Sequence, residues 1–163
     1  MSVKETFPAD GKFSRVNGLL RLLFHNKGRL QMAMLESLTN EDLTLLLPQV
    51  HAAEMLKLVR ISNDDIIITE LGKSLNYNDE DAIEKVAEQL KKYEPFKTAY
   101  KLSQERKKFT TEELSEILAE KNITFHLDKE KNMNIIKNLL FQWGIYFGII
   151  DYLGINDVWI QER

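Results

Sequence analysis

The stretch that decides the fold is residues 41–68, EDLTLLLPQVHAAEMLKLVRISNDDIII. Its apolar residues recur at helical spacing from Glu41 as far as about Leu58, which predicts an amphipathic helix. Two short runs rich in β-branched residues follow, Val59–Ile61 and Ile66–Ile68, and the polar turn between them predicts a small β-hairpin. A helix that leads directly into such a hairpin is typical of a winged-helix unit.

The same pattern occurs again in residues 128–160, DKEKNMNIIKNLLFQWGIYFGIIDYLGINDVWI. Here the spacing predicts a helix from about Lys129 to Phe147, followed by a second hairpin with strands at Ile150–Tyr152 and Val158–Ile160. We therefore expect a mainly α protein with small β-hairpins, built from tandem winged-helix (helix-turn-helix plus wing) modules.

The remainder of the chain predicts where these modules begin and end. Residues 1–12 are polar and contain a proline and a glycine, so we expect a flexible N-terminus. Residues 13–78 form the first winged-helix module, with additional helices over Ser14–Asn26 and Leu30–Leu38. A polar hinge then leads into residues 79–163, which hold a connecting helix and the second winged-helix module.

The amino-acid composition excludes several kinds of functional site and indicates where the protein is found. The 163 residues include no cysteine, which excludes disulfides, thiolate zinc sites and a cysteine nucleophile. The first residues lack the apolar core of a signal peptide. The longest apolar stretch, Leu139–Ile150, is shorter than the roughly 20 residues that cross a bilayer. We expect a cytoplasmic protein that does not insert into membranes.

The charge distribution weighs against nucleic acid as a ligand. The net charge is −3, and the first module places Glu41, Asp42, Asp64 and Asp65 on its helix start and hairpin turn. The second module is better suited, because asparagine can read adenine and lysine can hold phosphate. Its candidate nucleic-acid contacts are Lys129, Lys131, Asn134, Lys137 and Asn138. The competing interpretation of these residues is an ordinary solvated helix face.

Association with a protein is the hypothesis that the sequence favours. Aromatic side chains are enriched at the cores of interfaces. The candidate interface residues lie around the hinge and the helix that follows Pro95, and they are Tyr77, Tyr93, Phe96 and Tyr100. The same side chains could instead join the two modules of one chain. A homodimer and a small-ligand sensor with an aromatic-lined cavity between the modules are further alternatives.

No pattern in the sequence indicates catalysis. The three histidines, His25, His51 and His126, stand apart from one another and form no metal-binding motif. The paired carboxylates fall in predicted turns, where acidic residues are common. We therefore expect no enzymatic activity, no cofactor and no metal.

Several segments together resemble the AAA-associated C-terminal domain family. They are LLPQVHAAEML at 46–56, ITELGK at 68–73 and FQWGIY at 141–146, with Pro8 and VNGLL at 16–20 upstream. The resemblance spans nearly the whole chain, and it rests on the order and spacing of these segments. The chain departs from the family locally at Met55–Leu58 and after Gly144, where an arginine and an acid often follow the Trp-Gly pair.

In that family the domain usually follows an ATP-binding cassette like those of nitrate, sulfonate and bicarbonate importers. The resemblance therefore implies a regulatory or interaction role beside an ABC-type ATPase subunit. This sequence contains no Gly-x-x-x-x-Gly-Lys-Ser/Thr phosphate-binding loop, so any ATP hydrolysis would have to reside in a partner. The alternative hypothesis is a DNA-binding transcription regulator that acts through the second module.

Overall fold

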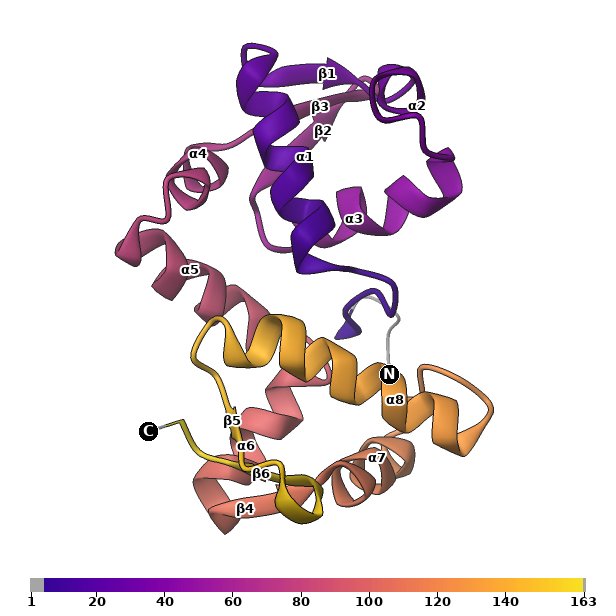
Figure 1. Cartoon of the computed structure of the whole chain (residues 1–163), viewed down its shortest axis with the longest axis vertical. Coiled ribbons are helices and arrows are strands. Elements are labelled where there is room, and N and C mark those ends of the chain that lie inside the picture. The colour runs from indigo at the N-terminus through magenta and orange to yellow at the C-terminus, as the bar shows by residue number, and fades with distance from the viewer. Residues whose placement is uncertain (1–4, 163) are drawn as a thin grey trace. The chain divides into compact units, whose positions relative to one another are not determined.

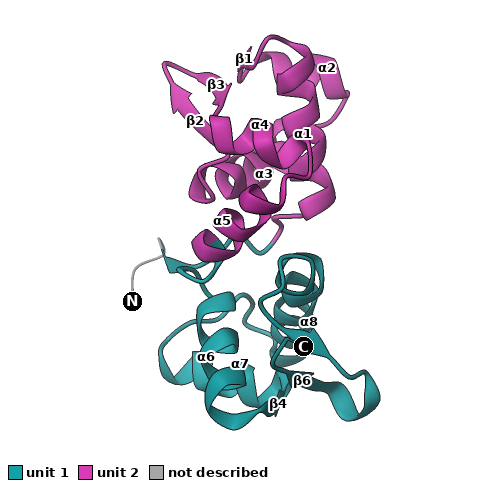
Figure 2. Cartoon of the chain, turned by 90° about the vertical axis from the view of Figure 1, so that its left-hand side faces the viewer, with its two compact units in different colours: residues 1–9, 90–163 teal, residues 10–89 magenta. Residues whose placement is uncertain are grey.

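The computed structural model describes residues 5–162, which fall into two compact units. Figure 2 colours them separately. We call residues 10–89 the N-terminal unit, and residues 5–9 together with 90–162 the C-terminal unit. Both are mainly helical with a small antiparallel sheet, as the sequence predicted.

The N-terminal unit packs its helices around a three-stranded sheet with strand order β1-β3-β2 (Figure 1). Helix α1 buries Val16, Leu20 and Leu23 on one face, at the spacing expected of an amphipathic helix. The helices are α1 (Phe13–His25), α2 (Met34–Thr39), α3 (Leu43–Met55), α4 (Glu70–Asn76) and α5 (Glu80–Leu90), and the strands are β1 (Arg29–Gln31), β2 (Val59–Ser62) and β3 (Asp65–Ile68).

The C-terminal unit has a sheet of order β4-β6-β5 and an aromatic core. Trp143 is fully buried there, stacked on Phe147 and edge-on to Phe7. The helices are α6 (Phe96–Arg106), α7 (Thr111–Glu120) and α8 (Lys129–Leu139), and the strands are β4 (Lys108–Thr110), β5 (Asp151–Tyr152) and β6 (Val158–Ile160). Helix α8 continues into a π-helical turn, η2 (Leu140–Ile145), and a short 3₁₀ turn, η3 (Ile155–Asp157), precedes β6.

The two units repeat one topology. In each, a helix is followed by a short strand, two helices and a hairpin, and the first strand pairs with the last strand of the hairpin. Both hairpins lie where the sequence predicted them, with Ile61 opposite Ile66 in one and Tyr152 opposite Trp159 in the other. The repetition seen in the sequence is therefore a repetition of the fold.

The third strand of each sheet was missed by sequence analysis. The predicted helix over Leu30–Leu38 is in fact β1 followed by α2, and β4 was not predicted at all. Each of these strands has three residues, with a single buried side chain at Leu30 or Phe109. A strand this short shows no alternating pattern, because alternation needs about four residues or more to be recognised.

The boundaries of the units also differ from the predicted ones. Residues 1–4 of the predicted flexible segment 1–12 lie outside the described residues, but Phe7 is buried in the C-terminal unit rather than loose. Its amide donates to the Glu94 carbonyl, and the Glu94 amide donates to Glu5. The units divide near Leu90 instead of residue 79, so the connecting helix α5 groups with the N-terminal unit.

Candidate functional site

All five predicted nucleic-acid residues belong to α8; four of them are exposed, and Lys137 is half-buried. Asp128 begins the helix by accepting a hydrogen bond from the Lys131 amide at 3.0 Å. Lys131, Asn134 and Asn138 are exposed, and the two asparagines are one helical turn apart. Lys129 is also exposed, but its ammonium group lies 3.1 Å from the Glu112 carboxylate of α7.

Lys137 takes part in a network centred on Asp157, at the end of the hairpin turn. The Asp157 carboxylate accepts hydrogen bonds from the Tyr152 hydroxyl at 2.9 Å and the Thr111 hydroxyl at 3.0 Å, and the Lys137 ammonium lies 3.2 Å away. Thr111 in turn accepts from the buried Trp159 indole N–H at 2.8 Å. The carboxylate thus ties the hairpin to the start of α7 and to α8.

The network changes the proton affinity of both charged groups. Partial burial by itself raises the pKa of Asp157, but hydrogen bonds from Thr111, Tyr152 and Lys137 outweigh it and lower that pKa below 3.8. The Tyr152 side chain and the Asp157 carboxylate raise the pKa of Lys137 above its ordinary value. Both groups are therefore held in their charged forms at neutral pH.

Replacing Asp157 with asparagine is expected to lower the free energy of unfolding of the C-terminal unit by about 1–2 kcal/mol at neutral pH, because Lys137 loses its counter-charge. Asparagine tolerates the positive φ of this position, which is 55°. The pKa of Asp157 is lower in the folded state than in the unfolded chain. The Asp157 charge therefore stabilises the fold fully at pH values well above 3.8, and this stabilisation is lost as the pH falls through the folded-state pKa.

Urea unfolding followed by tryptophan fluorescence should therefore show a difference between wild type and Asp157→Asn that shrinks on acidification from neutral pH to about pH 3. Glu116→Gln, at an exposed position of α7, is the matched control and should change stability by less than about 0.5 kcal/mol. A difference that stays constant with pH would show that the Asp157 charge does not stabilise the fold.

Of the predicted interface residues, Tyr77 belongs to the N-terminal unit, and Tyr93, Phe96 and Tyr100 belong to the C-terminal unit. Phe96 is completely buried and packs edge-on against Phe7, so it is part of the core and cannot serve as a surface contact. Tyr93 and Tyr100 are half-buried, and the Lys91 ammonium lies over the Tyr100 ring. Tyr77 is 68% exposed and touches Phe24 within the N-terminal unit.

Several exposed apolar side chains that the sequence analysis missed lie on the β5–β6 hairpin and on the segment before it. The tip of the hairpin carries Leu153 and Ile155, which are 49% and 77% exposed. Phe141 lies on the η2 turn and Tyr146 just after it; both are exposed, and the Phe141 ring contacts Tyr152. We call Phe141, Tyr146, Leu153 and Ile155 the hairpin patch. Two large apolar residues in a predicted turn were the available signal, because turns are usually polar.

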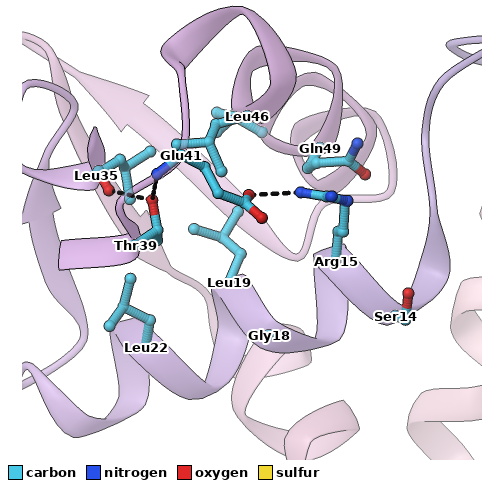
Figure 3. Close-up of a pocket in the computed structure, with 11 residues that line it drawn as sticks. Ser14, Arg15, Gly18, Leu19, Leu22, Leu35, Thr39, Glu41, Leu46 and Gln49 are labelled. Atoms are coloured by element: carbon cyan, nitrogen blue, oxygen red, sulfur yellow. Dashed lines mark hydrogen bonds and ion pairs between the residues drawn. The ribbon is translucent and has the colours of Figure 1, made fainter. Parts of the chain in front are cut away.

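The N-terminal unit contains a hollow of about 480 Å³ between α1, α2 and α3. Figure 3 shows the Arg15 side chain extending from α1 to the Glu41 carboxylate, with which it forms an ion pair across the hollow. The apolar lining of the hollow consists of Leu19, Leu22, Leu35, Leu46 and Val50. The cavity that sequence analysis offered as one alternative was aromatic-lined and between modules, whereas this hollow lies within one unit and is lined mainly by aliphatic side chains.

Within residues 5–162, no three His, Asp or Glu side chains are grouped so that they could hold a metal ion. Nor does any helix of this described part have the length and apolar character needed to cross a membrane. Three features are candidate binding sites. They are the α8 face, which carries the exposed Lys131, Asn134 and Asn138, the hairpin patch, and the hollow between α1, α2 and α3, which we call the leucine-lined hollow.

Comparison with known proteins adds one finding. The model of the C-terminal AAA-associated domain family matches residues 33–153, which include most of both units. No curated protein and no solved structure matches the chain. The matched segment contains three of the quoted motifs completely, LLPQVHAAEML, ITELGK and FQWGIY, and confirms the resemblance that they indicated. The chain belongs to the C-terminal AAA-associated domain family.

Proposed function

We propose that this protein is a non-catalytic interaction module, made of tandem winged-helix units, that binds and regulates an ATP-binding cassette subunit of an importer in the cytoplasm. Membership of the C-terminal AAA-associated domain family supports the choice of an ATPase partner. The repeated order of helices, short strand and hairpin supports the winged-helix assignment of each unit.

The observation that carries the proposal is the hairpin patch. In a DNA-binding winged helix the hairpin approaches the nucleic-acid backbone and needs polar or basic residues there. Here the tip presents Leu153 and Ile155. Burial of exposed apolar side chains against a partner stabilises the complex, by roughly 25 cal/mol for each Å² buried. The chemistry of this tip therefore fits a protein surface.

The alternative is duplex DNA bound by the α8 face, which the exposed Lys131, Asn134 and Asn138 favour. Against it, the ammonium groups of Lys129 and Lys137 lie close to carboxylates of their own unit. Binding to DNA would have to break these pairs before the lysines could neutralise phosphates. Retention on duplex DNA that weakens steeply with salt, and further after Ala substitution of Lys129, Lys131 and Lys137, would identify this alternative.

The experiment uses purified cassette subunits from the same genome and measures their binding to the immobilised full chain. The double variant Leu153→Ser, Ile155→Ser is expected to weaken capture of the partner cassette at least about tenfold, because two anchor side chains are lost. Leu127→Ser is the matched control, since Leu127 is fully exposed in the same unit but lies in the loop before α8. It should bind as the wild type does.

Regulation requires that the chain bind one nucleotide state of the cassette more tightly than another. Capture should therefore differ between ATP-loaded and nucleotide-free cassette, and the chain should change the rate of ATP hydrolysis. If no cassette of the genome binds, or if the control and the double variant lose binding equally, the proposal fails.

A further inference from the structure

A glycine on α1 borders the leucine-lined hollow of the N-terminal unit. Gly18 lies in the middle of α1 and lines the hollow, and a Cβ added there would meet no atom within 4 Å. Glycine inside a helix is less favourable than alanine by roughly 0.5–1 kcal/mol in general. No close contact in this structure requires a glycine there, and the exposed Gly18 has open space beside it.

The hollow has the composition of a small-molecule site. Its volume of about 480 Å³ lies within the usual range for ligand pockets. The polar Gln49 beside it is 3% exposed, and its amide is used internally: the oxygen accepts from the Lys12 amide and the nitrogen donates to the Asp10 carbonyl, both at 2.8 Å. Gln49 therefore holds the wall in place and offers little to a ligand.

The charged groups of the lining are Arg15 and Glu41, which pair with each other while each remains about one-third exposed. In Figure 3 they face one another on the side of α1 to which Leu19 points. A guanidinium has five N–H donors, so Arg15 can bind a second carboxylate while it keeps Glu41. A ligand carboxylate alone would then lie close to the Glu41 carboxylate, and the two would repel each other.

A zwitterionic head group removes that repulsion. Its carboxylate would meet Arg15, and its ammonium group would meet Glu41, so that no charge is left without a partner. An aliphatic chain on the same molecule would enter the space above Gly18 and contact the leucines. We propose that the hollow binds a free α-amino acid with a large aliphatic side chain. This site goes beyond the proposed function, and the chain alone is sufficient to test it.

The test is isothermal titration of the full chain with L-leucine. Three matched probes each lack one feature: 4-methylpentanoate has no ammonium group, isopentylamine has no carboxylate, and L-serine has no aliphatic chain. L-leucine is expected to bind, and each of the other probes should bind at least about tenfold more weakly, because one charged or apolar contact is lost. Absence of L-leucine binding, or equal binding of 4-methylpentanoate, would overturn the proposal.

Two substitutions at Gly18 locate the binding. Gly18→Leu places a side chain in the hollow and is expected to abolish binding, whereas Gly18→Ala adds one methyl group in open space and should retain it. Circular dichroism would verify that both variants fold. Arg15→Gln should weaken binding of L-leucine at least about tenfold. Retained binding in Gly18→Leu would place the ligand elsewhere and refute the site, whatever the cassette experiment shows.

Discussion

Trp143→Ala is expected to lower the free energy of unfolding of the C-terminal unit by about 3–5 kcal/mol, the range found when large aromatic core residues are truncated. Trp143 is completely buried, with its ring centroid 5.0 Å from that of Phe7 and 5.9 Å from that of Phe147. Phe7 comes from the opposite end of the chain, so the indole also anchors the N-terminal segment. Removal of the indole would leave a large cavity between this segment and η2.

The chain has two tryptophans, and Trp159 remains in the variant as a reporter of the same unit. Its fluorescence in a urea titration should show the transition at a much lower denaturant concentration than in the wild type. Tyr146→Ala is the control, because Tyr146 is three residues further along and 47% exposed. It should cost less than about 1 kcal/mol. Similar losses in both variants would refute a core centred on Trp143.

Much of this core could be predicted from the sequence. The predicted buried face of this helix carries Met133, Ile136, Leu140, Trp143 and Phe147. The structure buries the last four and leaves Met133 half-buried. The hairpins were predicted correctly because their strands are β-branched or aromatic and are separated by clear turn residues. These signals are local, and periodicity within one element is enough to reveal them.

The features that the sequence did not reveal depend on partners far apart in the chain. Phe7 packs on Trp143, and Thr111 bonds with Asp157, across 46 positions in the latter case. Lys137 looked like a phosphate contact because the acid that neutralises it lies on the hairpin. The hollow beside Gly18 likewise arises only when three helices are packed, since each helix taken alone shows an ordinary apolar face.

Gly72→Ala is the second substitution for which a large effect is expected, in this case in the N-terminal unit. A Cβ on Gly72 would lie 2.2 Å from the Leu58 carbonyl oxygen and 2.7 Å from the Ile68 side chain. The carbonyl cannot easily move, because it accepts hydrogen bonds from both the amide and the hydroxyl of Thr69 at 3.0 Å. We expect a loss of about 3 kcal/mol, at the upper end of the usual cost of overpacking.

Gly18→Ala is the matched control, and its effect on stability is expected to have the opposite sign. Gly18 and Gly72 both lie inside helices of the N-terminal unit, but a Cβ on Gly18 meets nothing within 4 Å. Gly18→Ala should therefore stabilise the unit by about 0.5–1 kcal/mol through helix propensity alone. Far-ultraviolet circular dichroism in urea would measure both variants. If Gly72→Ala is also neutral or stabilising, α4 does not pack against the β2–β3 hairpin as closely as the structure has it. If Gly18→Ala destabilises, the space above α1 is filled, and the site for an aliphatic ligand is lost with it.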